Sequence, residues 1–191
     1  MEIPQLSEGI YGTGEGRVVE LNFTYQNSRE SLRQMRNQVE AIFDAAEVYV
    51  SGDGADYLKL TQLYGFLMER FDYQVETSIT PAYSLLRHGV GDSKAFAVVY
   101  AAMCHQAGLE CYVVTGTRNG EPWYWNIVCS DGDSFHVDLL RCREFGGFRR
   151  FSDRDMNGYV WDYSAYPECG GGQSQQTEQI IPEETKANEA P

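Results

Sequence analysis

The sequence predicts an α+β fold in which a central helix packs on an antiparallel β-sheet and additional helices lie on its N-terminal side. The best-defined helix follows a glycine-rich turn, residues 89–93, and carries an apolar stripe that ends at Gly108. The stripe consists of Phe96, Val99, Tyr100, Met103 and Ala107. Three strand-like segments come next, at residues 110–117, 123–130 and 134–140. They are joined by Asn-Gly and Asp-Gly, the dipeptides typical of tight hairpins, so the strands should form an antiparallel meander.

The N-terminal part of the chain predicts one strand and two amphipathic helices. Residues 1–16 are rich in glycine and lack periodicity, whereas residues 17–25 alternate as a strand does. A helix should follow with Ser31 as its N-cap. Its apolar face is Met35, Val39, Ile42, Phe43 and Ala46. The second helix has its apolar face at Leu60, Leu63, Tyr64, Leu67 and Phe71. Both faces have the helical spacing that indicates a shared core.

Length and composition predict a single domain. A chain of 191 residues with 42% hydrophobic content can bury one core. We expect residues 1–16 to be an irregular segment, residues 17–169 to be the domain and residues 170–191 to be a disordered acidic tail. The tail consists mainly of Gly, Gln, Glu, Thr and Pro, which cannot offset the entropy lost on ordering.

The charge of the chain excludes some functions. A formal net charge of -13 repels a phosphate backbone, so we expect no nucleic-acid partner. Apolar runs are far shorter than the roughly 20 residues that cross a bilayer, and Met1 is not followed by a signal-peptide pattern. We therefore expect the chain as given to be soluble, with no integral membrane span.

The cysteines suggest no metal site. The five cysteines are an odd number and lack the paired spacing of zinc ligands, so we expect no metal and no cofactor. Buried free thiols are the simplest interpretation. A disulfide between Cys142 and Cys169 in an oxidising compartment is the alternative left open.

One order of elements points to a known family. A helix opens after a glycine-rich turn, and a meander follows that ends in Phe135-His136-Val137-Asp138. This order resembles the transglutaminase-like superfamily of papain-related thiol enzymes over residues 57–140, and more loosely over residues 161–169. In that family a cysteine begins the central helix, a histidine lies on the next strand in a motif that continues with Trp and Asn, and an aspartate closes the strand after that.

The resemblance assigns the family's three catalytic positions to three residues of this chain, and only the aspartate position holds the family's residue type. Ser93 occupies the cysteine position, because the spacing to the helix end at Gly108 matches. The strand motif falls on Trp123-Tyr124-Trp125-Asn126, so Trp123 stands at the histidine position. Asp138 matches the aspartate. The segment at residues 81–86, which contains Tyr83, resembles the one that precedes the active-site turn in bacterial members.

These substitutions predict loss of the family reaction. A serine needs a positioned base more than an ionised thiolate does, and an indole is a donor only. We expect the Trp123 N–H to bond Asp138 or a backbone carbonyl, and Asp92 or Ser93 to cap the central helix. Among the histidines, His105 lies too far along the helix and His136 sits beside Asp138, which leaves His88 as a candidate base.

The predicted function is therefore that of a catalytically inactive transglutaminase-like domain, a pseudoenzyme, with a binding or scaffolding role. A protein, a peptide or a cell-wall component is the expected partner, and the bacterial cell envelope or exterior is the expected location. Candidate binding residues are Tyr83, Asp92, Tyr124, Trp125 and Asn126. The alternative is an active amide-bond hydrolase or acyltransferase that uses Ser93 with an unrecognised base.

Overall fold

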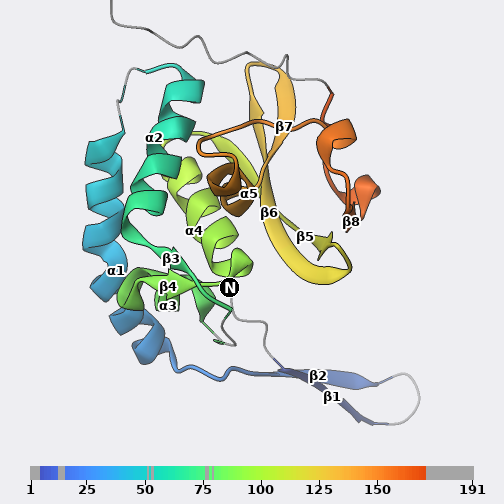
Figure 1. Ribbon diagram of the computed structural model, residues 1–191. Helices are drawn as coiled ribbons and strands as arrows, with labels where there is room; N and C mark the ends of the chain where they lie inside the picture. Colours follow the sequence, from blue (N-terminus) through green and yellow to red (C-terminus); the bar gives the residue numbers. More distant parts are fainter. Residues whose placement is uncertain are drawn as a thin grey trace, which may run out of the picture.

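The computed structural model describes residues 5–12, 16–50, 52, 54–75, 78 and 80–170, and it has the predicted α+β architecture (Figure 1). The helices are α1 (Arg29–Tyr49), α2 (Asp56–Arg70), α3 (Pro81–His88), α4 (Ser93–Gln106) and α5 (Leu139–Glu144), with 3-10 turns η1 (Asp153–Asp155) and η2 (Tyr163–Ala165). The strands are β1 (Gln5–Tyr11), β2 (Val18–Thr24), β3 (Asp72–Tyr73), β4 (Val90–Gly91), β5 (Glu110–Arg118), β6 (Glu121–Ser130), β7 (Asp133–Val137) and β8 (Tyr159–Trp161).

The main sheet has the order β7-β6-β5-β8, and every neighbouring pair is antiparallel. The two predicted hairpin turns are confirmed. Asn119 and Gly120 have φ values of 54° and 86°, and Asp131 and Gly132 have φ values of 55° and 81°. Positive φ at both central residues matches the twist of the flanking strands and fixes their register.

Helix α4 is the centre of the core. It lies against β5 and β6, while α1 and α2 lie on the side of α4 that faces away from the sheet (Figure 1). Phe96, Val99 and Tyr100 are at most 1% exposed, as the predicted stripe requires. Leu63 and Leu67 of α2 are buried to the same degree. Full burial of each such side chain contributes about 1.5–3 kcal/mol, so this helix is held firmly in place.

Two predictions about the N-terminal part were wrong. Residues 5–11 of the segment predicted to be irregular form β1, which pairs with β2. The alternation of β1 is interrupted by Glu8 on one side and by Tyr11 on the other, so only its pairing with β2 reveals it as a strand. The N-cap of α1 is Ser28 rather than Ser31, because the Ser28 hydroxyl accepts a hydrogen bond from the Ser31 N–H at 3.1 Å.

The last predicted strand is also shorter than expected. Strand β7 ends at Val137, and α5 begins at Leu139 where the prediction continued the strand to residue 140. The Asp138 carboxylate accepts hydrogen bonds from the backbone N–H groups of Leu140 and Arg141, both at 3.1 Å. This N-cap stabilises the helix and ends the strand.

The five cysteines are all free, so the Cys142–Cys169 disulfide is not formed in this structure. The Cys142 thiol instead exchanges hydrogen bonds with the backbone of Arg149 at 3.3 Å. Among the described helices, none is both long and apolar enough to span a membrane. The predicted disordered tail lies outside the described residues, apart from Gly170. The domain boundaries predicted at residues 17 and 169 stay a prediction.

Candidate functional site

Ser93 begins α4 at the end of the glycine-rich turn. Gly89 adopts φ +82°, which lets the chain leave α3 and enter the short strand β4. Asp92 is the N-cap of α4, and its carboxylate accepts the Ala95 N–H at 2.8 Å. Of the two cap candidates, Asp92 therefore does this job. Ser93 itself is 6% exposed, and its hydroxyl is not needed to cap the helix.

The Ser93 hydroxyl faces the strand that carries the Trp-Tyr-Trp-Asn motif. Its Oγ accepts a hydrogen bond from the backbone N–H of Tyr124 at 3.3 Å. Within the described part of the chain, no imidazole or carboxylate hydrogen-bonds this oxygen. His88 and His105 are exposed, at the ends of α3 and α4. In this structure the Ser93 hydroxyl is therefore engaged by the backbone of β6.

The Trp123 side chain reaches the carboxylate of Asp138. Its indole N–H donates to Asp138 Oδ2 at 2.8 Å, which is one of the two hydrogen bonds expected from the sequence. Trp123 lies on β6 and Asp138 directly follows β7, and the pairing of Asn126 with Val137 holds the two segments side by side next to these residues. An indole nitrogen donates but cannot accept a proton. The bond therefore holds the carboxylate without supplying a base.

Asp138 is 1% exposed and accepts hydrogen bonds from four groups. Besides the two backbone N–H groups on Oδ1, the Tyr159 hydroxyl donates to Oδ2 at 2.6 Å. Burial and the neighbouring Asp138 charge raise the pKa of Tyr159, so the phenol stays protonated and remains a donor. A buried carboxylate needs such partners, because an unpaired one is very costly. Both oxygens of Asp138 are fully used.

The Trp123 ring is fixed by its neighbours. The Arg118 guanidinium lies over the ring at 5.3 Å from its centroid, and Tyr73 lies at 5.9 Å on a tilted plane. Arg118 is itself held by two hydrogen bonds to Glu144, at 2.6 and 3.1 Å. A cation over an indole face is attracted by the ring's electron density. The indole is thus half-buried and anchored from several sides.

His136 is engaged elsewhere and does not serve Asp138. Its Nδ1 accepts the Trp125 indole N–H at 2.9 Å, and its Nε2 lies 2.8 Å from Asp153. Because an indole only donates, Nδ1 carries no hydrogen, so Nε2 carries the proton and donates to Asp153. Burial lowers the pKa of His136 against the opposing effect of Asp153. The imidazole is therefore a neutral structural group.

Three described residues form a cluster of metal-ligand types: His136, Asp153 and Cys169, whose ligand atoms lie within 4.8 Å of one another. The tautomer of His136 opposes metal binding. A histidine that binds a metal through one ring nitrogen normally carries its proton on the other, and here that other nitrogen accepts a hydrogen bond. Burial also raises the pKa of the Cys169 thiol to about 12, which disfavours the thiolate ligand. The cluster fits a structural role.

The predicted binding residues divide into half-buried and buried ones. Trp125 and Asn126 are at most 1% exposed, which contradicts a direct contact with a ligand. The Asn126 side-chain N–H₂ group donates to the backbone carbonyls of Ala97 and Tyr112, at 2.9 and 3.2 Å, and so ties α4 to the sheet. Its carbonyl oxygen is the one buried side-chain oxygen or nitrogen without a partner in the described part of the chain.

The other predicted binding residues differ in their surroundings. Tyr83 is half-buried and its hydroxyl hydrogen-bonds Gln38 of α1. Tyr124 is half-buried next to Ser93, with the Lys94 ammonium 5.4 Å from its ring centroid. Asp92 is half-buried at the start of α4, where its carboxylate caps the helix, and Tyr124 lies beside the same helix start. Of the five, Asp92 and Tyr124 therefore lie where a ligand at the start of α4 would meet them.

Sequence reasoning missed Tyr159 and Arg118, which complete the surroundings of Trp123 and Asp138. Tyr159 follows Gly158 in a short segment with no motif spacing to the triad positions. Arg118 precedes a turn, where a charged residue is ordinary. No sequence signal could have identified either residue, because both reach the site through the pairing of β8 with β5 and through side-chain packing.

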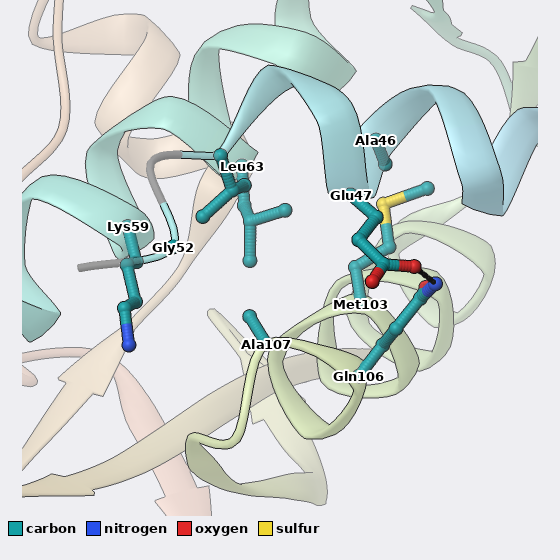
Figure 2. Close-up of a pocket in the computed structure, with 9 residues that line it drawn as sticks. Ala46, Glu47, Gly52, Lys59, Leu63, Met103, Gln106 and Ala107 are labelled. Carbon is teal, nitrogen blue, oxygen red and sulfur yellow. Dashed lines mark hydrogen bonds between the residues drawn. The ribbon is translucent and has the colours of Figure 1, made fainter. Parts of the chain in front are cut away.

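A small cavity lies at the other end of α4 (Figure 2). Its volume is about 160 Å³, and Met103 and Gln106 of α4 line it, with Ala107 just beyond the helix and residues of α1, α2 and the segment between them. The Gln106 amide donates to Glu47 at 2.8 Å across it. Ser93 lies at the start of α4, so this cavity is not part of the triad site.

The fold and the site together define a papain-like domain with a Ser-Trp-Asp arrangement, and comparison with known proteins supports this class. Residues 44–170 match the transglutaminase-like superfamily. The match covers well over half of the chain, which therefore belongs to the transglutaminase-like superfamily. A search of curated proteins finds no match.

A search of solved structures finds several matches, including the following three. A TGase crystal structure has a TM-score of 0.47 and 12% identity, covering 69% of this chain and 43% of that chain. A candidate cysteine protease from Cytophaga hutchinsonii has a TM-score of 0.45 and 14% identity, and the match covers 82% of this chain and 70% of that chain. A candidate protease from Parabacteroides distasonis has a TM-score of 0.42 and 11% identity, and the match covers 69% of this chain and 35% of that chain. The chain thus spans less than half the length of the first of these structures.

Proposed function

We propose that this chain is a catalytically inactive transglutaminase-like domain, in which Ser93, Trp123 and Asp138 occupy the three triad positions. The observation that supports this most is the 2.8 Å hydrogen bond from Trp123 Nε1 to Asp138 Oδ2. In the family a histidine would make this bond with one nitrogen and take a proton with the other. The indole reproduces the first half of that arrangement and lacks the second.

The chemistry at Ser93 follows from this exchange. A hydroxyl attacks only if a base removes its proton, and the base position holds a ring that cannot accept one. Loss of a triad member costs several orders of magnitude in rate. The helix N-terminus would favour a developing anion, but that contribution does not replace the missing base.

A binding or scaffolding role is the function that remains, with a peptide or cell-wall component as the ligand and the bacterial envelope as the location. Tyr124 and Lys94 are the side chains at the start of α4 that a ligand would meet. Co-sedimentation of the purified protein with peptidoglycan tests the cell-wall ligand. We expect Tyr124→Ala to reduce the bound fraction severalfold and the distant Val48→Ala to leave it unchanged. Equal binding by both variants would place the binding surface elsewhere.

The triad assignment is tested by repair. In the double variant Ser93→Cys with Trp123→His, the new imidazole should lie between the new thiol and Asp138 and lower the pKa of the thiol. We expect rapid alkylation by iodoacetamide at neutral pH in the double variant and slow alkylation in Ser93→Cys alone. Peptidase or amine-transfer activity would be a second readout. A folded double variant whose new thiol reacts no faster than that of the single variant contradicts the triad assignment.

Inactivity is tested on the unmodified chain. A fluorophosphonate probe labels an activated serine, and we expect no label at Ser93 by mass spectrometry. Labelling that disappears in Ser93→Ala would establish the competing function, an amide-bond hydrolase or acyltransferase that uses another base.

A further inference from the structure

The β1–β2 hairpin has one apolar face. Antiparallel pairing sets Leu6 opposite Phe23, Glu8 opposite Leu21 and Ile10 opposite Val19. Side chains alternate between the two faces of a strand, so these three pairs share one face. Apart from Glu8, the residues on this face are apolar. We use the term apolar face for these five residues: Leu6, Ile10, Val19, Leu21 and Phe23. The opposite face carries Gln5, Ser7, Gly9, Glu20, Asn22 and Thr24, and its apolar residues are confined to the Tyr11–Val18 pair at the turn end.

The apolar face is uncovered. Its five side chains are between 49% and 66% exposed. Figure 1 shows the hairpin projecting away from the helices and from the main sheet. A lone two-stranded hairpin is at best marginally stable in water and needs a further layer to bury its apolar side. The exposed face is therefore an interaction surface.

The size and charge of the face decide what covers it. The fractional exposures correspond to about 500 Å² of accessible surface, and two such faces to roughly 1,000 Å², which is near the lower limit of a specific interface. Within residues 5–12 and 16–25, Arg17 is the one cation. With a net charge of -13, the chain is repelled by an anionic membrane. An apolar face of the same size and shape is the best match.

We propose that the apolar face packs on the same face of a second copy of this chain, forming a symmetric dimer. Two identical faces related by a two-fold axis are complementary by construction, and stacked sheets lie about 10 Å apart. An axis parallel to the strands places β1 over β2 of the second copy, which keeps the two Glu8 carboxylates apart. An axis across the strands would place them over each other, so the parallel axis is the one chosen. This dimer does not depend on the proposed function.

Analytical ultracentrifugation of the whole chain over a concentration series tests the dimer. We expect a monomer–dimer equilibrium whose Kd falls as salt is added, because salt screens the repulsion between two acidic copies. The double variant Leu21→Thr with Phe23→Thr should raise the Kd roughly tenfold or more while it keeps β-forming side chains. The matched double variant Glu20→Thr with Asn22→Thr changes the opposite face and should not weaken the dimer. A chain that stays monomeric up to its solubility limit overturns the proposal.

Hydrogen exchange of the unmodified chain separates loss of the interface from unfolding of the hairpin. Backbone amides of β1 and β2 should become more protected as the concentration rises, whereas those of β5 should not change. A dimer whose concentration-dependent protection lies outside the hairpin refutes the proposal, as does a dimer that survives the Leu21→Thr, Phe23→Thr change intact.

Discussion

The hydrogen bond from Trp123 to Asp138 gives the most direct prediction about stability. Trp123→Phe keeps an aromatic ring and removes the N–H donor, which leaves the Tyr159 hydroxyl as the one side-chain donor to Oδ2 within the described residues. A hydrogen bond to a charged group contributes about 1.5–3 kcal/mol. Because Trp123 is half-buried, we expect the lower part of that range, about 1.5–2 kcal/mol. For a chain of this size the melting temperature should fall by roughly 3–8 °C.

Chemical denaturation at neutral pH measures the change in the free energy of unfolding. Tyr124→Phe is the matched control, because no hydrogen bond to its hydroxyl is found among the described residues, and it should cost less than about 0.5 kcal/mol. Combining Trp123→Phe with Tyr159→Phe leaves Oδ2 without a side-chain donor, so the double variant should cost at least about 0.5 kcal/mol more than the sum of the two. In an Asp138→Asn background the cost of Trp123→Phe should shrink. An unchanged cost there would refute the assigned role of the bond.

Three further predictions concern groups away from Ser93. Burial lowers the pKa of His136 below its usual 6.5, so stability should be complete above pH 6.5 and fall as the pH drops through the lowered value, and His136→Asn should flatten this dependence of the melting temperature. Gly116→Ala should cost more than about 3 kcal/mol, since the new Cβ would lie 2.2 Å from a backbone oxygen of β8, whereas Gly65→Ala in α2 meets no atom within 4 Å and should be neutral or stabilising by up to about 1 kcal/mol in urea denaturation. Burial raises the pKa of Cys142 to about 12, so native-state alkylation followed by mass spectrometry should modify the half-buried Cys129 first, and faster labelling of Cys142 would contradict its burial.

The central part of the fold could be predicted because its signals are local. The stripe on α4 and the Asn-Gly and Asp-Gly turns each specify one element, and the order of those elements specifies the antiparallel sheet. Helix α3 was not predicted as a helix: residues 81–86 were noted only for their resemblance to a family segment. Pro81 in its first turn and Gly89 at its C-cap are nevertheless ordinary helix boundaries. Its eight residues are too few for periodicity to identify it.

The candidate site was predictable only in part, because it depends on contacts between distant segments. The pairing of Trp123 with Asp138 followed from the family motif. The Tyr159 hydroxyl reaches the same place from β8, a three-residue strand that no pattern predicts, and the pairing of β8 with β5 sets Tyr159 opposite Arg118. The burial of Asn126 likewise depends on α4 and β5 meeting around it. The residue type of Asn126 alone did not distinguish a ligand-binding role from a structural one.

The way Asp138 is held suggests how an enzyme of this fold can lose its chemistry and keep its structure. One oxygen of the carboxylate starts α5, and the other is satisfied by an indole N–H and a phenol. Exchange of imidazole for indole keeps an N–H donor facing the buried negative charge, so the substitution removes proton transfer while the charge remains compensated. At the Trp123 position, proton transfer and charge compensation are thus separable: the same N–H donor that stabilises the buried carboxylate needs no basic nitrogen behind it.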